Sequence, residues 1–213
     1  MKSLAFEKTG SVLCLGAHSD DIEIGCGGTM LRLLAANPAA AVHWVVFSAR
    51  ADRAREAEAS ATRFLAGAAT RAVELHQFRD GFFPAEQARI KTYFEELKSR
   101  VQPDVIFTHY RDDLHQDHRV ICELTWNTFR NHMILEYEVP KWDGDMGRPN
   151  VYVHLGAADA GRKVEILMEC FATQAGKHWF DAETFTSLMR LRGLECNAPE
   201  RRAEAFYGRK VIL

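Results

Sequence analysis

The feature that most restricts the fold is a series of short apolar runs that alternate with longer helical patterns. Three runs read SVLCLGA (11–17), AVHWVVFSA (41–49) and DVIFTHY (104–110), and VELHQF (73–78) is a weaker fourth. Each run is bounded by Gly, Pro or polar residues and is too short for a typical helix. Continuous apolar runs of this length are typical of strands buried on both faces, as in a parallel sheet.

Helical patterns separate these runs, over 28–37, 51–67, 85–100 and 115–131. This alternation predicts an α/β fold: a Rossmann-like, doubly wound, mainly parallel sheet with helices on both faces.

After about residue 134 the pattern changes. Two further strands flank a Pro/Gly/Asp-rich loop (140–149), helical patterns cover 159–174 and 182–193, and a last strand is expected within 203–213. The 213 residues contain no internal repeat and no linker, so we expect a single domain over 1–213 with extra strands near its C-terminus.

Composition excludes several classes of protein. The net charge is −2, without the strong basic excess typical of nucleic-acid binding. No apolar stretch reaches 18 residues and the N-terminus lacks a signal-peptide pattern, so we expect a cytoplasmic protein without a transmembrane segment. The five cysteines are widely spaced and form no CxxC pair, which argues against disulfides and against a cysteine-based zinc site. Homo-oligomerisation stays open.

Two polar clusters follow apolar runs. AHSDD comes after the run at 11–17, and THYRDDLHQDH (108–118) comes after the run at 104–110. Ligands of open α/β sheets bind beyond the carboxyl ends of the strands, so we expect the clusters to meet at one rim. Together they contain His18, Asp20, Asp21, Glu23, His109, Asp112, Asp113, His115, Asp117 and His118.

Histidine and carboxylate side chains without cysteine suit zinc or another divalent metal. A catalytic zinc ion usually takes three protein ligands, which His18, Asp21 and His118 could supply. Asp20 would then stay free as the general base. His115, oriented and kept charged by the carboxylate of Asp117, is the candidate for stabilising an oxyanion or protonating the leaving group.

Structural roles compete with these assignments. Each cluster could simply cap a helix and complement its dipole, but two such clusters at two expected strand exits favour a functional site. The glycines of GCGG (25–28) do not form a dinucleotide-binding motif; we expect Gly27 and Gly28 to permit a tight turn and close packing.

At these residues the chain resembles the LmbE-like (PIG-L) family of zinc-dependent N-deacetylases. The family signature AHPDD-x-E, followed by a glycine pair, is matched by residues 17–23 with Gly27 and Gly28. The H-x-D-H block is matched at 115–118 and the C-terminal AEAF at 203–206. Ser19 stands where the family usually has proline; because serine also adopts the extended geometry, we expect activity to survive this difference.

Carried over by position, the resemblance implies a zinc ion on His18, Asp21 and His118. It implies that Asp20 is the general base, that His115 is the acid or oxyanion stabiliser with Asp117 behind it, and that Glu23 supports the turn. An arginine of the segment ARADRARE (49–56) often serves the site in this family. Arg53 is the candidate for substrate binding, with Arg50 and Arg55 as rivals.

The activity implied by the resemblance is hydrolysis of an N-acetyl group from an amino sugar or sugar conjugate, releasing acetate and a free amine. The metal would be Zn2+, with Fe2+ or another divalent ion as an alternative. Two other functions stay open. One is an amidase for a larger sugar–thiol conjugate, whose pocket the loop with Trp142 and Met146 could shape; the other is a non-catalytic sugar-binding protein.

Overall fold

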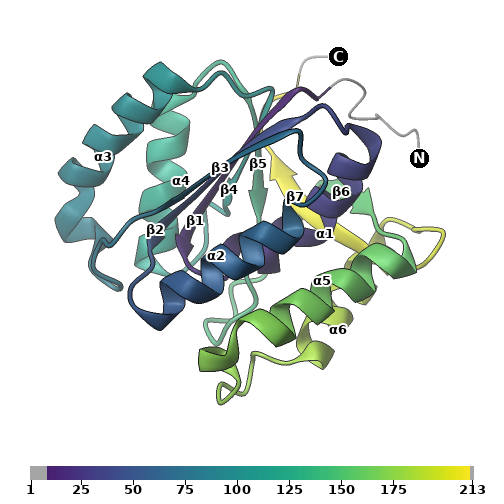
Figure 1. Cartoon of the computed structure of the whole chain (residues 1–213). Helices are drawn as coiled ribbons and strands as arrows, with labels where there is room; N and C mark the ends of the chain where they lie inside the picture. Colours follow the sequence, from purple (N-terminus) through teal and green to yellow (C-terminus); the bar gives the residue numbers. More distant parts are fainter. Residues whose placement is uncertain (1–8, 212–213) are drawn as a thin grey trace.

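The computed structural model describes residues 9–211, and its seven strands form one sheet in the order β3-β2-β1-β4-β5-β7-β6 (Figure 1). The first five strands along the chain are mutually parallel: β1 (Ser11–His18), β2 (Ala41–Ser48), β3 (Thr70–Leu75), β4 (Val105–His109) and β5 (Met133–Tyr137). β7 (Ala203–Gly208) runs antiparallel to both β5 and β6 (Val151–His154). The expected parallel sheet with extra C-terminal strands is confirmed.

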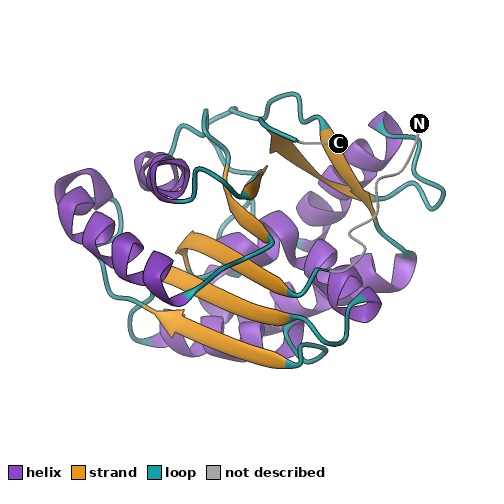
Figure 2. Ribbon diagram, turned by 90° about the horizontal axis from the view of Figure 1, so that it is seen from above, coloured by secondary structure: helices purple, strands orange, loops and turns teal. Residues whose placement is uncertain are grey.

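Helices cover both faces of this sheet, as Figure 2 shows from above. One face packs against α1 (Asp21–Ala36), α2 (Asp52–Phe64), α5 (Ala157–Cys170) and α6 (Ala182–Glu195). The other face packs against α3 (Phe83–Arg100) and α4 (Gln116–Thr128). A short 3-10 helix, η1 (Ala172–Gln174), follows α5.

Burial on both faces explains why the strands are continuously apolar. In β1, Val12 and Cys14 belong to the core under α1 and α2, while Leu13 and Leu15 belong to the core under α3 and α4. Successive side chains of a strand point to opposite faces, so a central strand covered twice needs apolar residues at every position.

The structure corrects the expected start of the first helix. α1 begins at Asp21, so the acidic motif lies in its first turn and the glycines lie inside it. Gly27 therefore forms no tight turn, but the expected close packing is present. A Cβ atom at Gly27 would lie 2.7 Å from a ring carbon of Phe64, and one at Gly25 would overlap the ring of Tyr137.

The C-terminal elements also differ in detail from the expectation. β5 and β6 are not neighbours, because β7 lies between them. α6 continues through Gly193 and ends at Glu195. The last strand ends at Gly208, and residues 212–213 of the expected strand lie outside the described part of the chain.

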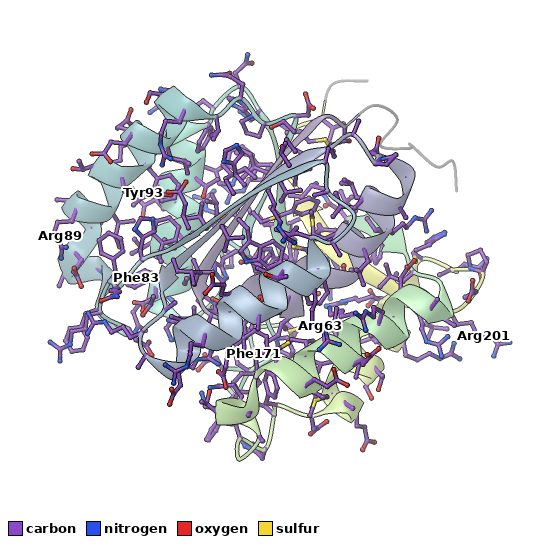
Figure 3. The ribbon with its side chains drawn as sticks, viewed as in Figure 1. Arg63, Phe83, Arg89, Tyr93, Phe171 and Arg201 are labelled. Carbon is purple, nitrogen blue, oxygen red and sulfur yellow. The ribbon has the colours of Figure 1, made fainter. Side chains whose placement is uncertain are left out.

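Charged side chains fix the later helices to the earlier part of the fold. Arg63 of α2 lies against α5 in Figure 3 and pairs with Glu165 at 3.1 Å and Glu169 at 2.6 Å. On the opposite side of the sheet, Phe83 and Tyr93 project from α3 into the second core.

Within residues 9–211, no helix combines the length and the apolar character that crossing a membrane requires.

Candidate metal and catalytic site

The site lies where the strand order of the sheet reverses. β1 has β2 on one side and β4 on the other, so the carboxyl ends of β1 and β4 flank a topological switch point. His18 ends β1 and His109 ends β4, while Asp21 begins α1 and His118 lies in the first turn of α4. The prediction that the two polar clusters meet at one rim is therefore confirmed.

Three donor atoms form a nearly regular triangle. Nδ1 of His18 lies 3.2 Å from Nε2 of His118 and 3.3 Å from Oδ2 of Asp21. The side from Nε2 of His118 to Oδ2 of Asp21 measures 3.5 Å. Ligand atoms about 2.0–2.1 Å from a tetrahedral zinc ion lie roughly 3.3 Å apart. The two imidazoles and the carboxylate therefore fit a divalent ion in both donor type and spacing.

The protonation of His118 also suits a ligand. Burial and the adjacent His109 lower the pKa of His118 to about 3, so the imidazole is neutral at pH 7. Only a neutral imidazole offers a lone pair to a metal.

His109 belongs to the same cluster, although neither spacing nor motif assigned it a role. Its ring stacks on that of His118 at 3.9 Å, and its Nε2 lies 3.3 Å from Oδ2 of Asp21. That Nε2 already accepts a hydrogen bond from the backbone N–H of Ala17 at 2.9 Å. His109 is fully buried and is absent from the cavity wall, whereas His18 lines the cavity. The donor triangle that includes His18 therefore lines the cavity, whereas His109 lies behind it.

Asp113 orients His118 from behind. Its Oδ2 lies 2.9 Å from Nδ1 of His118 and 2.9 Å from Nζ of Lys141, and its Oδ1 accepts the backbone N–H of His115. Burial alone would raise the pKa of Asp113, but the hydrogen bond from His118 holds it well below its usual range. A carboxylate on the second nitrogen of a metal-binding histidine fixes the tautomer and the ring orientation.

The structure corrects the expected role of Asp117. Its carboxylate was predicted to orient His115, but Oδ2 lies 3.3 Å from Nε2 of His18. The same carboxylate accepts the backbone N–H groups of Gly81 at 2.6 Å and Phe83 at 3.0 Å. Asp117 is fully buried between α4 and the loop before α3, and its contact with His115 is made by its backbone N–H and not by its carboxylate.

The loop before α3 contributes a residue that the sequence motifs did not mark. Oδ1 of Asp80 lies 3.1 Å from Nε2 of His18. Asp80 follows VELHQF, the fourth expected strand, so the rule that placed the other two clusters would also have placed this carboxylate at the rim.

His115 both caps helix α4 and lies at the candidate site. It caps α4, because its Nδ1 accepts the backbone N–H of Asp117 at 3.3 Å. The helix-capping alternative is therefore correct for this histidine, which also lines the cavity. Burial and the neighbouring His18 lower the pKa of His115, which favours the neutral ring. With Nδ1 accepting, its proton resides on Nε2.

One carboxylate oxygen of Asp20 forms no hydrogen bond with any described residue. Its Oδ1 lies 2.6 Å from a guanidinium nitrogen of Arg53, while the buried Oδ2 has no hydrogen-bond partner within residues 9–211. Burial raises the pKa of the Asp20 carboxyl, and the positive charge of Arg53 opposes this shift. Asp20 occupies the N-cap position of α1 but makes no side-chain capping bond.

The three candidate arginines have different partners. Arg53 contacts Asp20 and also pairs with Glu56 at 3.1 Å. Arg50 donates to the backbone oxygen of Gln77, and Arg55 pairs with Asp52. Arg53 is therefore the arginine that reaches the expected base.

Ser19 and Glu23 complete the motif without touching the donor triangle. Oγ of Ser19 lies 3.4 Å from the backbone oxygen of Ser48, and the residue is fully buried. Glu23 is also fully buried, and neither of its carboxyl oxygens has a partner among the described residues. Burial raises the pKa of Glu23 to about 8.

A cavity of about 730 Å³ opens beside the triangle. Side chains from β1, the strand-end loops and the segment around η1 contribute to its wall: His18, Asp20, Asp21, Ser48, Arg50, Arg53, Arg79, Asp80, His115, His118, Val139, Lys141, Trp142, Asp143, Gln174, Lys177 and Trp179. The three residues of the donor triangle, Asp20 and His115 therefore line one cavity that is large enough for a small molecule.

Comparison with protein families gives a match over residues 13–129, more than half of the chain. The matching family is PIG-L, described as GlcNAc-PI de-N-acetylase. No curated protein matches the sequence.

Solved structures share the fold at low sequence identity. GalB, the 4-carboxy-2-hydroxymuconate hydratase of Pseudomonas putida KT2440, superposes with a TM-score of 0.74 at 19% identity, over 96% of this chain and 98% of its own. The conserved protein TT1542 of Thermus thermophilus gives 0.73 at 19% identity, over 95% of both chains. The N,N'-diacetylchitobiose deacetylase of Pyrococcus horikoshii gives 0.68 at 18% identity, over 95% of this chain and 85% of its own.

Proposed function

Because the chain belongs to the PIG-L family of de-N-acetylases, we propose that it is a metal-dependent hydrolase that removes an N-acetyl group from an amino sugar or sugar conjugate. The products are acetate and a free amine. One observation carries the proposal: Asp20, whose Oδ2 has no hydrogen-bond partner among the described residues, lines the same cavity as the three residues whose donor atoms are spaced for a divalent ion.

The proposed metal ligands are His18, Asp21 and His118, with zinc or iron(II) as the ion that such donors suit. When bound, such an ion lowers the pKa of a water molecule towards about 7 and polarises a carbonyl group. Asp113 and Asp117 orient the two imidazoles through their second nitrogens.

The protein's own groups move the protons. Asp20 accepts a proton from the attacking water at Oδ2, while Arg53 holds Oδ1. His115 donates from Nε2 to the oxyanion that develops on the acetyl carbonyl. The protonated Asp20 then gives its proton to the departing nitrogen, so that water and amide become acetate and amine.

Two variants test this assignment. Asp20→Asn should bind one zinc ion per chain, as the wild type does, but lose about 10²–10⁴-fold in the rate of acetate release. His118→Ala should lose the metal itself. Asp112→Asn is the matched control, because Asp112 is an exposed carboxylate in the loop between β4 and α4. Near-normal turnover of the metal-loaded Asp20→Asn protein would exclude Asp20 as the base.

The choice of substrate panel separates the alternatives. The fold alone does not select the reaction, because it is shared with a hydratase, so acetate release is the deciding measurement. Faster cleavage of large sugar–thiol conjugates than of simple N-acetyl sugars would identify the amidase alternative. Tight sugar binding without any acetate release would identify a non-catalytic binding protein.

A further inference from the structure

The loop between β5 and β6 is held together by one arginine. The buried guanidinium of Arg192 pairs with Glu138 at 2.7 Å and donates to the backbone oxygen of Gly147 at 3.3 Å. The segment 138–147, which we call the cavity loop, is therefore an Ω-loop, a compact loop whose ends lie close together. Four of its residues line the cavity: Val139, Lys141, Trp142 and Asp143.

Lys141 connects the cavity loop to the candidate metal site. Its Nζ lies 2.9 Å from Oδ2 of Asp113, the same oxygen that faces Nδ1 of His118 at 2.9 Å. The other oxygen of Asp113 accepts the backbone N–H of His115 at 2.8 Å. Of the lysines and arginines between residues 9 and 211, Lys141 alone pairs with this carboxylate. The cavity loop therefore supplies the cation that stands next to the residue behind His118.

The ammonium group of Lys141 has no donor left for a bound molecule, although the residue lines the cavity. Besides Asp113, it pairs with Asp145 of the same loop and donates to the backbone oxygen of Val139 at 3.4 Å. An ammonium group has three N–H donors, and each of them has an acceptor. Lys141 therefore acts on other residues of the protein and not on a substrate.

The bridge that Lys141 forms is nearly dry. The exposed fraction of the side chain is 11% for Lys141, 2% for Asp113 and 5% for Asp145. Asp145 in turn accepts the backbone N–H of Leu114 at 2.8 Å, so both carboxylates are attached to the segment before α4. Removing one partner of a buried pair leaves the other charge without compensation, whereas an exposed pair can be broken at little cost.

One oxygen of Asp113 thus serves both the metal site and the cavity loop. When His118 binds a cation through Nε2, its Nδ1–H becomes a stronger donor to Asp113. A carboxylate that Lys141 already holds in place accepts this bond without further ordering. Metal affinity and the position of the cavity loop are therefore coupled, and a coupling free energy is the same in both directions.

We propose that Lys141 is a positioning residue that couples the cavity loop to the metal site through Asp113, so that loss of Lys141 weakens metal binding and metal binding changes the surroundings of Trp142. The inference rests on the metal site of the proposed function and adds a residue outside the motifs that marked that site.

Competition with a zinc chelator tests the first effect. Lys141→Met should weaken zinc binding by about tenfold, the lower end of the range for groups that orient a metal-binding histidine. Lys141→Arg keeps the positive charge and should retain most of the affinity. Lys177→Met is the matched control, because Lys177 is an exposed lysine of the cavity wall, and it should bind zinc as the wild type does.

Tryptophan fluorescence tests the reverse effect. Trp142 follows Lys141 and is 71% exposed, so its emission depends on the position of the cavity loop. Zinc should shift the emission of the wild type, and Trp142→Phe should abolish this shift. Trp179→Phe, which removes another tryptophan of the cavity wall, should preserve it. In Lys141→Met the shift should be absent even at saturating zinc, where the metal site is full.

Asp145→Asn separates the two halves of the bridge. It leaves the pair of Lys141 with Asp113 in place, so zinc affinity should stay within about threefold of the wild type, while the Trp142 shift should decrease. This variant also keeps the inference testable if Lys141→Met does not fold.

The outcomes distinguish this inference from the proposed function. Unchanged zinc affinity in Lys141→Met, or a Trp142 emission that does not respond to zinc, would overturn the coupling and leave the proposed function standing. If zinc binds and shifts the Trp142 emission but no N-acetylated compound releases acetate, the proposed function fails and the coupling stands. A wild type that binds no zinc would overturn both.

Discussion

The guanidinium of Arg53 lies 2.6 Å from Oδ1 of Asp20 and joins the first turn of α2 to the start of α1. Arg53 opposes the rise that burial causes in the pKa of Asp20. The contact therefore sets the pH range in which Asp20 is ionised and able to accept a proton.

Replacing Arg53 by Gln should move the acidic limb of the activity profile to higher pH. The general base must be ionised, so kcat/KM rises as the pH passes the pKa of Asp20, and removal of a neighbouring cation raises that pKa further. Profiles of kcat/KM against pH check this shift, with Arg53→Lys retaining part of the wild-type position. Arg55→Gln serves as a control, since Arg55 pairs with Asp52 instead. An unshifted limb in Arg53→Gln would separate Arg53 from the ionisation of Asp20.

From the position of Asp117 we predict that replacing this residue lowers the metal affinity and not only the rate of proton transfer. Its carboxylate faces Nε2 of His18, so Asp117→Asn should weaken metal binding by about 10–100-fold. Competition with a zinc chelator measures the dissociation constant directly. If Asp117 acted through His115, the same substitution would lower kcat and leave metal affinity unchanged. Asp112→Asn, which alters an exposed carboxylate nearby, should leave metal affinity at the wild-type value.

Substitutions of Lys163 and Glu204 should have strongly non-additive effects on the free energy of unfolding. Nζ of Lys163 donates to the backbone oxygen of Ile24 and to Glu204, each at 2.6 Å, and the carboxylate of Glu204 accepts the N–H groups of Gly28 and Thr29. Lys163→Met leaves a buried carboxylate without its cation and should cost about 3–5 kcal/mol in urea unfolding.

The double variant Lys163→Met/Glu204→Gln should be less destabilised than the sum of its two single variants, because no unpaired charge remains buried. Additive losses would show that the two residues act independently. Lys91→Met removes a partly exposed pair with Glu95 on α3 and a hydrogen bond to Thr128, and this comparison should have a much smaller effect.

Glu23 should make the protein less stable as the pH rises. The carboxyl has a pKa of about 8 in the folded protein and an ordinary value of 4.5 when exposed. Between these values the folded state holds a proton that the unfolded state has lost, so the free energy of unfolding falls with increasing pH. Glu23→Gln should remove this dependence and raise stability most at pH 8.

Urea unfolding at pH 5, 7 and 8 measures the effect of Glu23→Gln. Glu58→Gln, an exposed carboxylate of α2, is the matched control and should follow the wild-type pH dependence. A Glu23→Gln curve parallel to the wild type across this range would contradict a neutral Glu23.

The sequence by itself determined the sheet and the rim on which the site stands. Apolar residues at every position of β1 require burial on both faces, and alternation with helices requires parallel strands. Parallel strands end on the same side, so residues about 100 positions apart, such as His18 and His118, are brought to one rim by topology alone. The resemblance of residues 17–23 and 115–118 to the family motifs added the proposed ligand set of His18, Asp21 and His118.

Only the tertiary structure decided which side chains face each other within that rim. Asp117 lies two residues from His115 in sequence, yet its carboxylate faces His18, because α4 turns that side chain towards the loop at Gly81. His109 stacks on His118, and Asp80 reaches His18 from a loop that no motif marks. The position of a residue in the sequence determines which strand end it follows. The side chain that it contacts depends on the rotation of each helix and the path of each loop, and these are set by packing across the whole fold.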